Sequence, residues 1–585
     1  MRKLIQGLGL MVLFLLISSC VNKDYDLDQV DGTVGFGSGG VTLPNDNSTA
    51  EIILDDLLNI SNSDIVITNE QGDYLLSKGT DEVDPVKVTI DPIDLVSEVS
   101  EGLSLDIDVP QELTPFMGMT IDVTEYNIAA DGRIAWFGYE FDAPEAVKDL
   151  EFVGLGINGE GCDFIFNLSL PMETICFEHV DLFFPDRLDM TWLNPIEGAV
   201  FDSSTNTLHL KDYVKPGDVQ LRFKVTRIRV GHTSDDNYAD FTNGHIAVKG
   251  TISADVKVAS LKVPSESHVS LSSSIDFSKV SITSAHGIFD PDIDMLEVGT
   301  VEITSIPDFL LDEEVVVDLD NPQIWMTIHS TMPLGGKLKG KLTSDCYPQG
   351  IILDTPGRIV NIKGSTDASE VETRVLLCRY NPGIDTNEIQ VIEDENLSKL
   401  VQKMENGMKL EFLVTEIKAD QEQCTVLLGH EYHLTPAFQF AAPLAFGPQA
   451  AIVYSDVFKD WNGDINKLDL SKGTYVHVMA TAVNKVPANL EVDVAPLGVD
   501  GQVLNELAVE LIKNDAAGSN GSPVESPIEV KITDTTGNGL KKLDGISLHL
   551  KASSNEQLRG ETLNKQSQTL VLKDIQVRLV GKIRI

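Results

Sequence analysis

The stretch from Asp460 to Asp464, with the sequence Asp-Trp-Asn-Gly-Asp, carries residue types that are well suited to bind a ligand. Asp460, Asn462 and Asp464 place oxygen atoms at alternate positions, which is how a loop wraps calcium. Trp461 offers an aromatic face on which a sugar ring can stack. The run departs from an EF-hand, because Gly463 stands before the third ligand and no Glu closes the loop. Ligand contact through these residues, calcium binding and a plain solvated turn all stay open.

Other motifs predict no catalytic or metal site. His430 and His433 are three residues apart in a β-like run, whereas the zinc-protease motif needs a spacing of four on a helix. No two cysteines have the CxxC spacing of a metal knuckle. Cys162 and Cys176 flank two β-like runs, so they either pair in a hairpin or stay as buried thiols. With 90 acidic residues, the sequence singles out no catalytic carboxylate pair.

The first 19 residues have the organisation of a secretory signal. Arg2 and Lys3 form a positive start, and Leu4 to Ile17 is an apolar run of about 14 residues. A bilayer crossing needs about 20 apolar residues, so this run is short for a membrane span. The sequence therefore predicts export and removal of residues 1–19.

Ile17-Ser18-Ser19-Cys20, at the end of the apolar run, resembles a bacterial lipobox. The resemblance implies that Cys20 is diacylated and becomes the first residue of the mature protein. Two or three acyl chains anchor a protein stably where one does not. The alternative is an ordinary secretory signal with an incidental cysteine.

Polar residues with alternating acids follow Cys20, in the run Val21-Asn22-Lys23-Asp24-Tyr25-Asp26-Leu27-Asp28. Together with the lipobox, this run resembles the acidic export signal of uncharacterised surface lipoproteins of Bacteroidota. The resemblance implies the outer face of the outer membrane, with the periplasmic leaflet as the alternative. Residues 20–47 are expected to form an acidic, Gly-rich tether, in which Gly35 to Gly40 is a flexible spacer.

The charge balance limits the partners. The chain of 585 residues carries 90 Asp and Glu against 44 Lys and Arg, a formal net charge of −46. Such a surface is unsuited to nucleic acid and to anionic lipid headgroups. The expected partners are the membrane, through the N-terminal lipid anchor, and a glycan or a surface protein. No cofactor is expected apart from the calcium considered above.

Period-2 alternation of apolar residues dominates the mature chain. Ile246, Val248, Ile252, Ala254, Val256 and Val258 share one face of such a run, and polar residues occupy the other face. A strand with one apolar face is typical of antiparallel sheets stacked as sandwiches. The apolar phase changes between Val225 and Ile228, which predicts a β-bulge or a change of sheet. Gln71-Gly72 and Asp131-Gly132 predict hairpin turns.

The predicted fold class is therefore all-β, with tandem antiparallel β-sandwich domains and a few short capping helices. The expected helices are 48–59 and 394–406, while 502–513 fits a helix or a strand. Trp136, Trp192 and Trp325 lie in apolar runs and are expected in the core. The β-sandwich regions are predicted at residues 48–263, 264–435 and 436–585.

A weak internal echo joins two of these regions. Residues 325–333 form an alternating run that ends in Met332-Pro333, and residues 478–487 form one that ends in Val486-Pro487. A second alternating run follows each. Duplicated β-domains and chance similarity both account for this echo.

These features favour a surface-exposed outer-membrane lipoprotein that acts as a non-enzymatic adhesion or binding module for glycan or protein. A polysaccharide-degrading enzyme and a structural or assembly lipoprotein of the envelope are the alternatives. A deep cleft with paired acids would favour the enzyme, whereas a shallow loop patch would favour the binding module.

Overall fold

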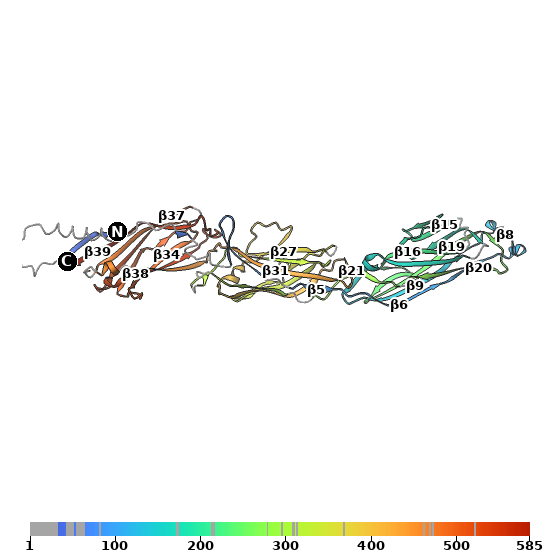
Figure 1. The fold of residues 1–585 in the computed structure, drawn as a ribbon, viewed down its shortest axis with the longest axis horizontal. Coiled ribbons are helices and arrows are strands. Elements are labelled where there is room, and N and C mark those ends of the chain that lie inside the picture. Colours follow the sequence, from blue (N-terminus) through green and yellow to red (C-terminus); the bar gives the residue numbers. More distant parts are fainter. Residues whose placement is uncertain are drawn as a thin grey trace, which may run out of the picture.

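Three β-sandwich lobes lie in a row and form an elongated rod (Figure 1). The computed structural model describes residues 33–42, 52–53, 65–80 and 84–584, with gaps at 171–174, 212–216, 278, 294–296, 307–309, 312–313, 367–368, 460–461, 467–469, 471–472 and 520–521. Each lobe has two facing sheets around its own hydrophobic core. The all-β sandwich architecture predicted from the sequence is confirmed. Among the described residues, the chain has no helix of sufficient length and apolar character to cross a membrane.

The lobes are named here by their place along the rod. The C-terminal lobe has a six-stranded and a four-stranded sheet: β1 (Thr33–Thr42), β2 (Ile52–Ile53), β33 (Tyr475–Asn484), β35 (Leu507–Lys513), β37 (Val524–Asp534) and β39 (Thr569–Arg584), against β32 (Ala451–Phe458), β34 (Asn489–Gly498), β36 (Asp515–Ala516) and β38 (Leu543–Ser553). The middle lobe has a seven-stranded and a five-stranded sheet: β3 (Val66–Thr68), β4 (Tyr74–Gly79), β5 (Val86–Thr89), β23 (Gln323–Ser330), β27 (Val371–Cys378), β28 (Ile389–Glu393) and β31 (Glu431–Pro443), against β22 (Glu297–Ile303), β24 (Gly336–Ser344), β25 (Tyr347–Leu353), β26 (Val360–Ile362) and β29 (Met408–Ala419).

The tip lobe is the third and forms the far end of the rod. Its eight-stranded sheet holds β7 (Ser104–Asp108), β10 (Val147–Leu155), β11 (Cys162–Leu170), β13 (Leu188–Trp192), β16 (Gly217–Arg229), β20 (His268–Asp276), β21 (Ile282–Phe289) and β30 (Cys424–Leu427). Its nine-stranded sheet holds β6 (Asp94–Gly102), β8 (Thr120–Asp122), β9 (Ala129–Asp142), β12 (Ile175–Phe183), β14 (Ala199–Asp202), β15 (Thr207–Lys211), β17 (Gly231–Ser234), β18 (Asn237–Thr242) and β19 (His245–Lys262).

Alternation along the strands explains the cores. In β19, the apolar face predicted from the sequence is buried from Ile246 to Val258, and polar residues lie between. In β16, Thr226 is skipped in the register with β13, because Arg227 faces Asp189 and Val225 faces Met190. This confirms the predicted bulge. The hairpin at Gln71-Gly72 is confirmed as well, since β3 pairs antiparallel with β4.

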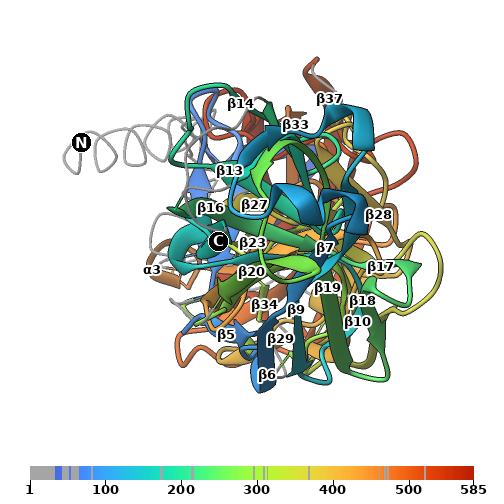
Figure 2. The same cartoon turned by 90° about the vertical axis from the view of Figure 1, so that its right-hand side faces the viewer.

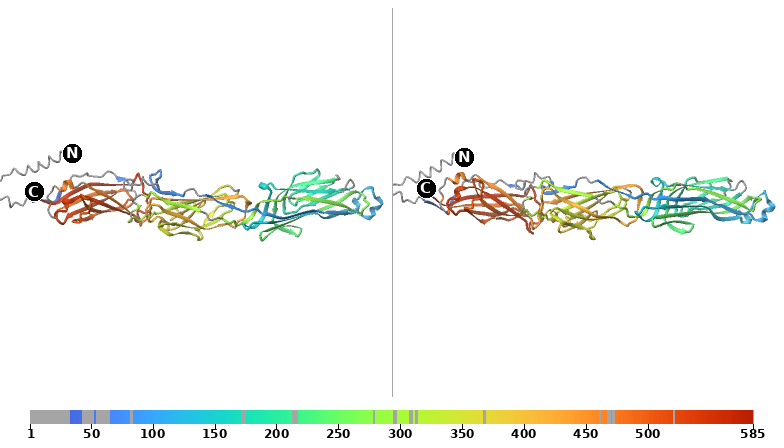
Figure 3. Two further views of the ribbon diagram at one scale, coloured as in Figure 1. Left: turned by 60° about the horizontal axis from the view of Figure 1, so that its bottom comes forward. Right: turned by 90° about the horizontal axis from the view of Figure 1, so that it is seen from below.

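The chain runs once along the rod from the C-terminal lobe to the tip lobe, as the climbing segment, and then returns, as the descending chain. The climbing segment adds β1 to the last strand of the C-terminal lobe, β39, and then adds β4 and β5 to the last strand of the middle lobe, β31. It next enters the tip lobe as β6 and β7 (Figure 3). The descending chain completes the tip, middle and C-terminal lobes in that order. The lower two lobes are therefore built from segments that are far apart in the sequence.

The middle and C-terminal lobes share one topology. In the middle lobe, β27, β23, β31 and β4 are neighbours in that order, and in the C-terminal lobe β37, β33, β39 and β1 are neighbours in that order. The strands after β23 and β33 both cross to the other sheet, where β24 pairs with β29 and β34 pairs with β38. The sequence echo thus corresponds to a repeated sandwich.

The two crossings are built alike. The Met332 N–H donates to Ser330 Oγ over 3.1 Å, and the Val486 N–H donates to Asn484 Oδ1 over 2.8 Å. The carbonyl oxygens of Met332 and Val486 accept from the N–H groups of Ser365 and Ser519. The members of each pair (330 and 484, 332 and 486, 365 and 519) are 154 positions apart in the chain. A constant offset over three separate positions is what a tandem duplication produces.

Several sequence expectations are wrong. Asp131 and Gly132 lie inside β9, where both pair with β19, so they form no hairpin turn. Gly35 to Gly40 belongs to β1 rather than to a flexible spacer, because a strand pairs through its backbone and glycine only weakens it. Trp136 and Trp325 are half-buried on outer faces, where their indole N–H groups donate to Glu101 and Gln323. Trp192 is half-buried and packs against the core.

Of the three segments for which a helix was considered, one contains a helix and two contain strands in their described parts. The run 394–406 holds a 3₁₀ helix, η7 (Leu397–Val401), with Leu397, Leu400 and Val401 buried as its spacing predicts. The segment 502–513 contains strand β35. The segment 48–59 lies mostly outside the described residues, and its described part, Ile52–Ile53, is strand β2. The tip lobe also continues past the predicted boundary at residue 264, because Leu271 and Phe289 are part of its core.

Loops from each lower lobe insert into the lobe above. β30, which precedes the last strand of the middle lobe, pairs with β21 of the tip lobe. The loop 554–568, which precedes the last strand of the C-terminal lobe, contacts the middle lobe. There Arg559 Nε lies 2.6 Å from Asp320 Oδ1, and Asn564 Nδ2 donates to Asp73 Oδ1 over 2.8 Å. Asp320 is buried and also accepts from the hydroxyl of Tyr380.

Replacing Arg559 with Ala is expected to destabilise the junction between the middle and C-terminal lobes by about 2–3 kcal/mol, because it leaves the buried Asp320 carboxylate without its cation. Urea unfolding measures the loss. Combining Arg559→Ala with Asp320→Asn should restore most of the stability, since a neutral amide needs no counter-charge. A single variant as stable as the parent would contradict this account.

Candidate functional site

The loop singled out from the sequence is only partly described. Asp460 and Trp461 lie outside the described residues, as does Cys20. Asn462 begins the short helix α3 (Asn462–Ile465), which also contains Asp464. The side-chain Nδ2 of Asn462 donates to the carbonyl oxygens of Lys541 and Leu543, over 2.8 and 3.4 Å. Asn462 thus fastens this loop to the C-terminal lobe, and ligand binding by these four residues stays a prediction.

The described thiols and histidines do not assemble into a reactive centre. All five described cysteines are unpaired, including Cys162 and Cys176. Burial raises the pKa of Cys378 and of Cys424 to about 11, so both are thiols at neutral pH. In the described part of the chain, no three His, Cys, Asp or Glu side chains gather closely enough to hold a metal ion.

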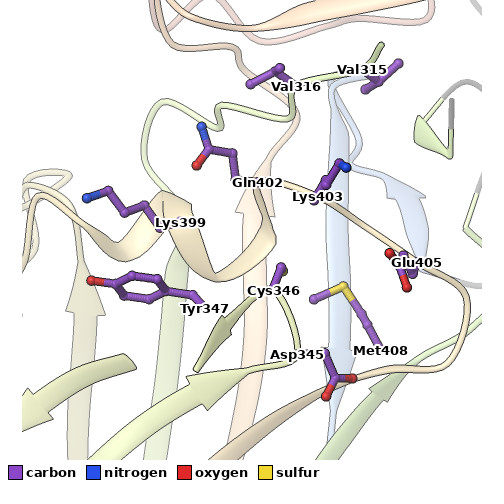
Figure 4. Close-up of a pocket in the computed structure, with 10 residues that line it drawn as sticks. All are labelled: Val315, Val316, Asp345, Cys346, Tyr347, Lys399, Gln402, Lys403, Glu405 and Met408. Carbon is purple, nitrogen blue, oxygen red and sulfur yellow. The ribbon is translucent and has the colours of Figure 1, made fainter. Parts of the chain in front are cut away.

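A pocket of about 450 Å³ opens on the middle lobe (Figure 4). Its lining mixes charges: Lys399, Lys403, Asp345 and Glu405 surround it. Lys399 Nζ lies 5.8 Å from the ring centroid of Tyr347, and the carboxylate of Asp345 accepts from the N–H of Lys409 over 2.8 Å. Lys399 and Asp345 thus have partners within the protein, and Val315, Val316 and Met408 give the lining an apolar part.

The far end of the rod carries a second candidate surface. Between β7 and β9 the chain forms η3 (Gln111–Phe116), β8 and η4 (Thr124–Tyr126), and β8 lies at the extreme end of the tip lobe (Figure 1). Four large apolar side chains of this loop are exposed, which we call the tip patch: Phe116 (40 %), Met117 (52 %), Met119 (58 %) and Tyr126 (43 %). All four belong to the one segment between β7 and β9, and exposed apolar side chains are candidates for contact with a ligand.

The tip patch is displayed by a loop that is fixed from below. Leu113 and Val123 are fully buried in the tip-lobe core and anchor the loop on both sides of the patch. The Gly118 N–H donates to the Val263 carbonyl over 2.9 Å, and the Val263 N–H donates to the Met119 carbonyl over 3.0 Å. Gly118 has a φ of 79°, which favours glycine there. The patch is therefore held in place before any ligand arrives, which lowers the entropic cost of binding.

Electrostatics around the tip patch are acidic. The hydroxyl and the N–H of Thr124 both donate to Asp122 Oδ1, over 2.6 and 2.9 Å, and hold the pKa of Asp122 below its usual value. Residues 90–148 contain thirteen Asp and Glu against one Arg and one Lys. The segment that carries the tip patch is thus rich in acids, while Lys262 of β19 pairs with Thr120 beside it. This charge balance disfavours an anionic ligand.

The sequence analysis missed the tip patch. Phe116, Met117, Met119 and Tyr126 lie among polar and Gly residues with no regular period, so they gave no strand or helix signal. A Pro-Phe-Met-Gly-Met run that breaks the alternation was the available clue, because an irregular apolar run between strands belongs either to a core or to an exposed site. Only the three-dimensional structure decides between these.

Comparisons with known proteins give weak similarities only. No family profile and no curated protein matches the chain. A putative secreted protein from Parabacteroides distasonis matches at 15 % identity, over 52 % of this chain and 89 % of its own, with a TM-score of 0.31. The adhesin domain of Epf from Streptococcus pyogenes matches at 10 % identity, over 60 % and 97 %, with a TM-score of 0.11. A putative membrane anchored protein from Corynebacterium diphtheriae matches at 8 % identity, over 87 % and 95 %, with a TM-score of 0.09.

The anchors and the exposed residues of the tip loop should respond differently to substitution. Leu113→Ala is expected to destabilise the tip lobe by about 2–5 kcal/mol, because it empties a buried site. Phe116→Ser should cost less, about 1 kcal/mol, because Phe116 is 40 % exposed. Urea unfolding and hydrogen exchange at Gly118 measure both effects. Equal losses in the two variants would show that the patch belongs to the core.

Proposed function

We propose that this chain is a lipid-anchored protein of the bacterial outer membrane, exposed at the cell surface, that acts as a non-enzymatic adhesion or binding module. Acyl groups on Cys20 hold the C-terminal lobe at the membrane. The tip patch contacts the ligand, which is a glycan or a surface protein.

The observation that carries the proposal is the placement of β1 and the tip patch at opposite ends of the rod (Figures 1 and 3). β1 begins at Thr33 and pairs with the last strand, β39. An extended chain advances by at most about 3.6 Å per residue, so the segment from Cys20 to Thr33 spans less than about 50 Å. An anchor on Cys20 therefore keeps the C-terminal lobe near the membrane and leaves the tip lobe free.

The chemistry of the tip patch supports binding rather than turnover. Aromatic and methionine side chains contribute much of the energy at protein interfaces, and aromatic rings also stack on sugars. A polysaccharide-degrading enzyme needs two carboxylates across a cleft, about 5–9.5 Å apart. The middle-lobe pocket is lined by two carboxylates, Asp345 and Glu405, and the Asp345 carboxylate accepts from the backbone N–H of Lys409. A structural or assembly lipoprotein of the envelope stays the second alternative, because an exposed apolar loop also serves contacts between proteins.

The loop with Asp460, Trp461, Asn462 and Asp464 is proposed as a secondary ligand contact, with calcium as its candidate ion. Asn462 joins it to the C-terminal lobe, at the end of the rod opposite the tip patch. A ligand bound there would lie near the membrane. The variant Trp461→Ala should weaken binding at this loop and leave binding at the tip patch unchanged, which distinguishes the two contacts.

Replacing Cys20 with Ser is expected to release the protein from the envelope, because a serine cannot carry the thioether-linked lipid. Fractionation of the envelope and metabolic labelling with palmitate measure this. The control is Cys346→Ser, which should leave both attachment and labelling unchanged. A Cys20→Ser protein that stays in the outer-membrane fraction would contradict lipid anchoring.

Screening of glycan arrays and of purified surface proteins should identify ligands of the soluble chain that begins at residue 21, which keeps β1. A ligand of the tip patch is expected to bind at least about tenfold more weakly to the double variant Phe116→Ser and Met117→Ser, because interface anchors contribute about 2 kcal/mol or more each. The matched control is Ile157→Ser with Val200→Ser, two exposed apolar positions of the tip lobe outside the patch. Turnover of any glycan would overturn the non-enzymatic proposal. Equal binding by the double variant and the parent would exclude the tip patch as the binding site.

A further inference from the structure

Strand β6 forms an open edge of the nine-stranded sheet in the tip lobe. It pairs with β9 from Asp94 to Gly102, and β9 pairs in turn with β19. In the described part of the chain, β6 has no strand on its other side. Figure 2, which views the rod from the tip end, shows β6 at the margin of the molecule. The N–H and C=O groups along this margin can therefore accept another strand.

This edge projects beyond the sandwich instead of lying over it. All residues from Asp94 to Glu101 are exposed, on both faces of the strand. Three of them are large and apolar: Leu95 (40 %), Val96 (57 %) and Val99 (46 %). On β9, Leu95 pairs with Phe141, which is buried, and Val99 pairs with Gly138. An added strand would cover apolar side chains that no described part of the chain covers.

The edge is also acidic and lacks its own counter-charges. Within the described residues, no Lys, Arg or His forms an ion pair with Asp94, Glu98 or Glu101. Glu101 accepts from the indole N–H of Trp136, and the neighbouring Glu140 accepts from the hydroxyl of Ser97. The strand thus offers a ladder of backbone groups, apolar side chains and unneutralised carboxylates together.

We propose that β6 is a docking edge, at which an extended segment of a basic partner protein adds as a further strand. Backbone hydrogen bonds provide the affinity in this mode of recognition, and alternate side chains provide the selectivity. Lys or Arg at alternate positions of the added strand face the acids of β6, and apolar residues cover Leu95, Val96 and Val99. This surface is separate from the tip patch and does not depend on the function proposed for it.

The charge pattern disfavours a second copy of this chain as the occupant in the pairing centred on Glu98. Two antiparallel β6 strands in that register would bring Glu98 against Glu98 and Asp94 close to Glu101, and like charges across a strand pair are destabilising. The acids of β6 therefore favour a cationic partner over a second copy of this chain.

A blocked ten-residue peptide that alternates Lys and Val tests this edge directly on the full soluble chain. Hydrogen exchange with mass spectrometry is expected to show added protection at residues 94–102, and added salt should weaken binding because charge attraction contributes. A Glu/Val peptide should not bind, and neither should a Lys/Val peptide interrupted by proline. Protection by the proline peptide, or protection elsewhere only, would overturn strand addition.

A charge-reversal pair gives the matched control. Glu98→Lys with Glu101→Lys is expected to weaken binding of the Lys/Val peptide by about tenfold or more, because it reverses the field at the edge. Glu160→Lys with Glu197→Lys changes the net charge equally at two exposed sites of the tip lobe and should bind as the parent does. Equal binding by both pairs would refute the docking edge. The variant Phe116→Ser should leave this binding intact, so failure here and failure of the tip patch are distinguishable.

Discussion

Backbone pairing between strands at the two ends of the described chain fixes the shape of this molecule. Thr33 of β1 faces Arg584 of β39, and β4 and β5 lie against β31, hundreds of residues away in sequence. The entropic cost of closing such loops rises only slowly with length, but distant pairings slow folding. The C-terminal and middle lobes are therefore complete only when both the climbing and the descending segments are in place. The same pairing confines β1 and β39 to one end and leaves the tip lobe free.

Stiffness follows from how the lobes are joined. A flexible linker would let three sandwiches tumble independently, as domains with small interfaces do. Here the climbing segment crosses both junctions, and each lower lobe also sends a loop upward: β30 pairs with β21, and Arg559 reaches Asp320. Met332 and Leu334 of the middle lobe belong to the tip-lobe core. A rod connected in this way carries a surface away from its base at a fixed distance, which a string of loosely tethered domains does not.

The sequence pattern predicted those features of the fold that depend on neighbouring residues, and few others. Alternation predicted the inward face of β19 and the bulge in β16, and the Gln71-Gly72 dipeptide predicted the hairpin between β3 and β4, because each depends on residues within one or two strands. Glycine content led to two wrong predictions, a flexible spacer at Gly35 to Gly40 and a turn at Asp131-Gly132. Both segments are strands, because they pair with β39 and β19. The exposure of Phe116 and Val96 depends on what the rest of the fold leaves uncovered, which no local pattern contains. The loop around Trp461 looked like a site from its composition alone.

The repeat also shows how the lower ends of the two lower lobes differ. At the lower end of the middle lobe, Tyr380 and Asp320 receive the loop that carries Arg559. In the C-terminal lobe, the position 154 residues after Tyr380 is Asp534. Its carboxylate accepts from the N–H groups of Thr536, Gly537 and Leu540, all in its own turn. The carboxylate of Asp534 is thus satisfied by local hydrogen bonds, whereas the polar groups of Tyr380 and Asp320 are satisfied by a loop of another lobe. The two copies of the repeat therefore use the same position differently: one joins two lobes, and the other stabilises a turn.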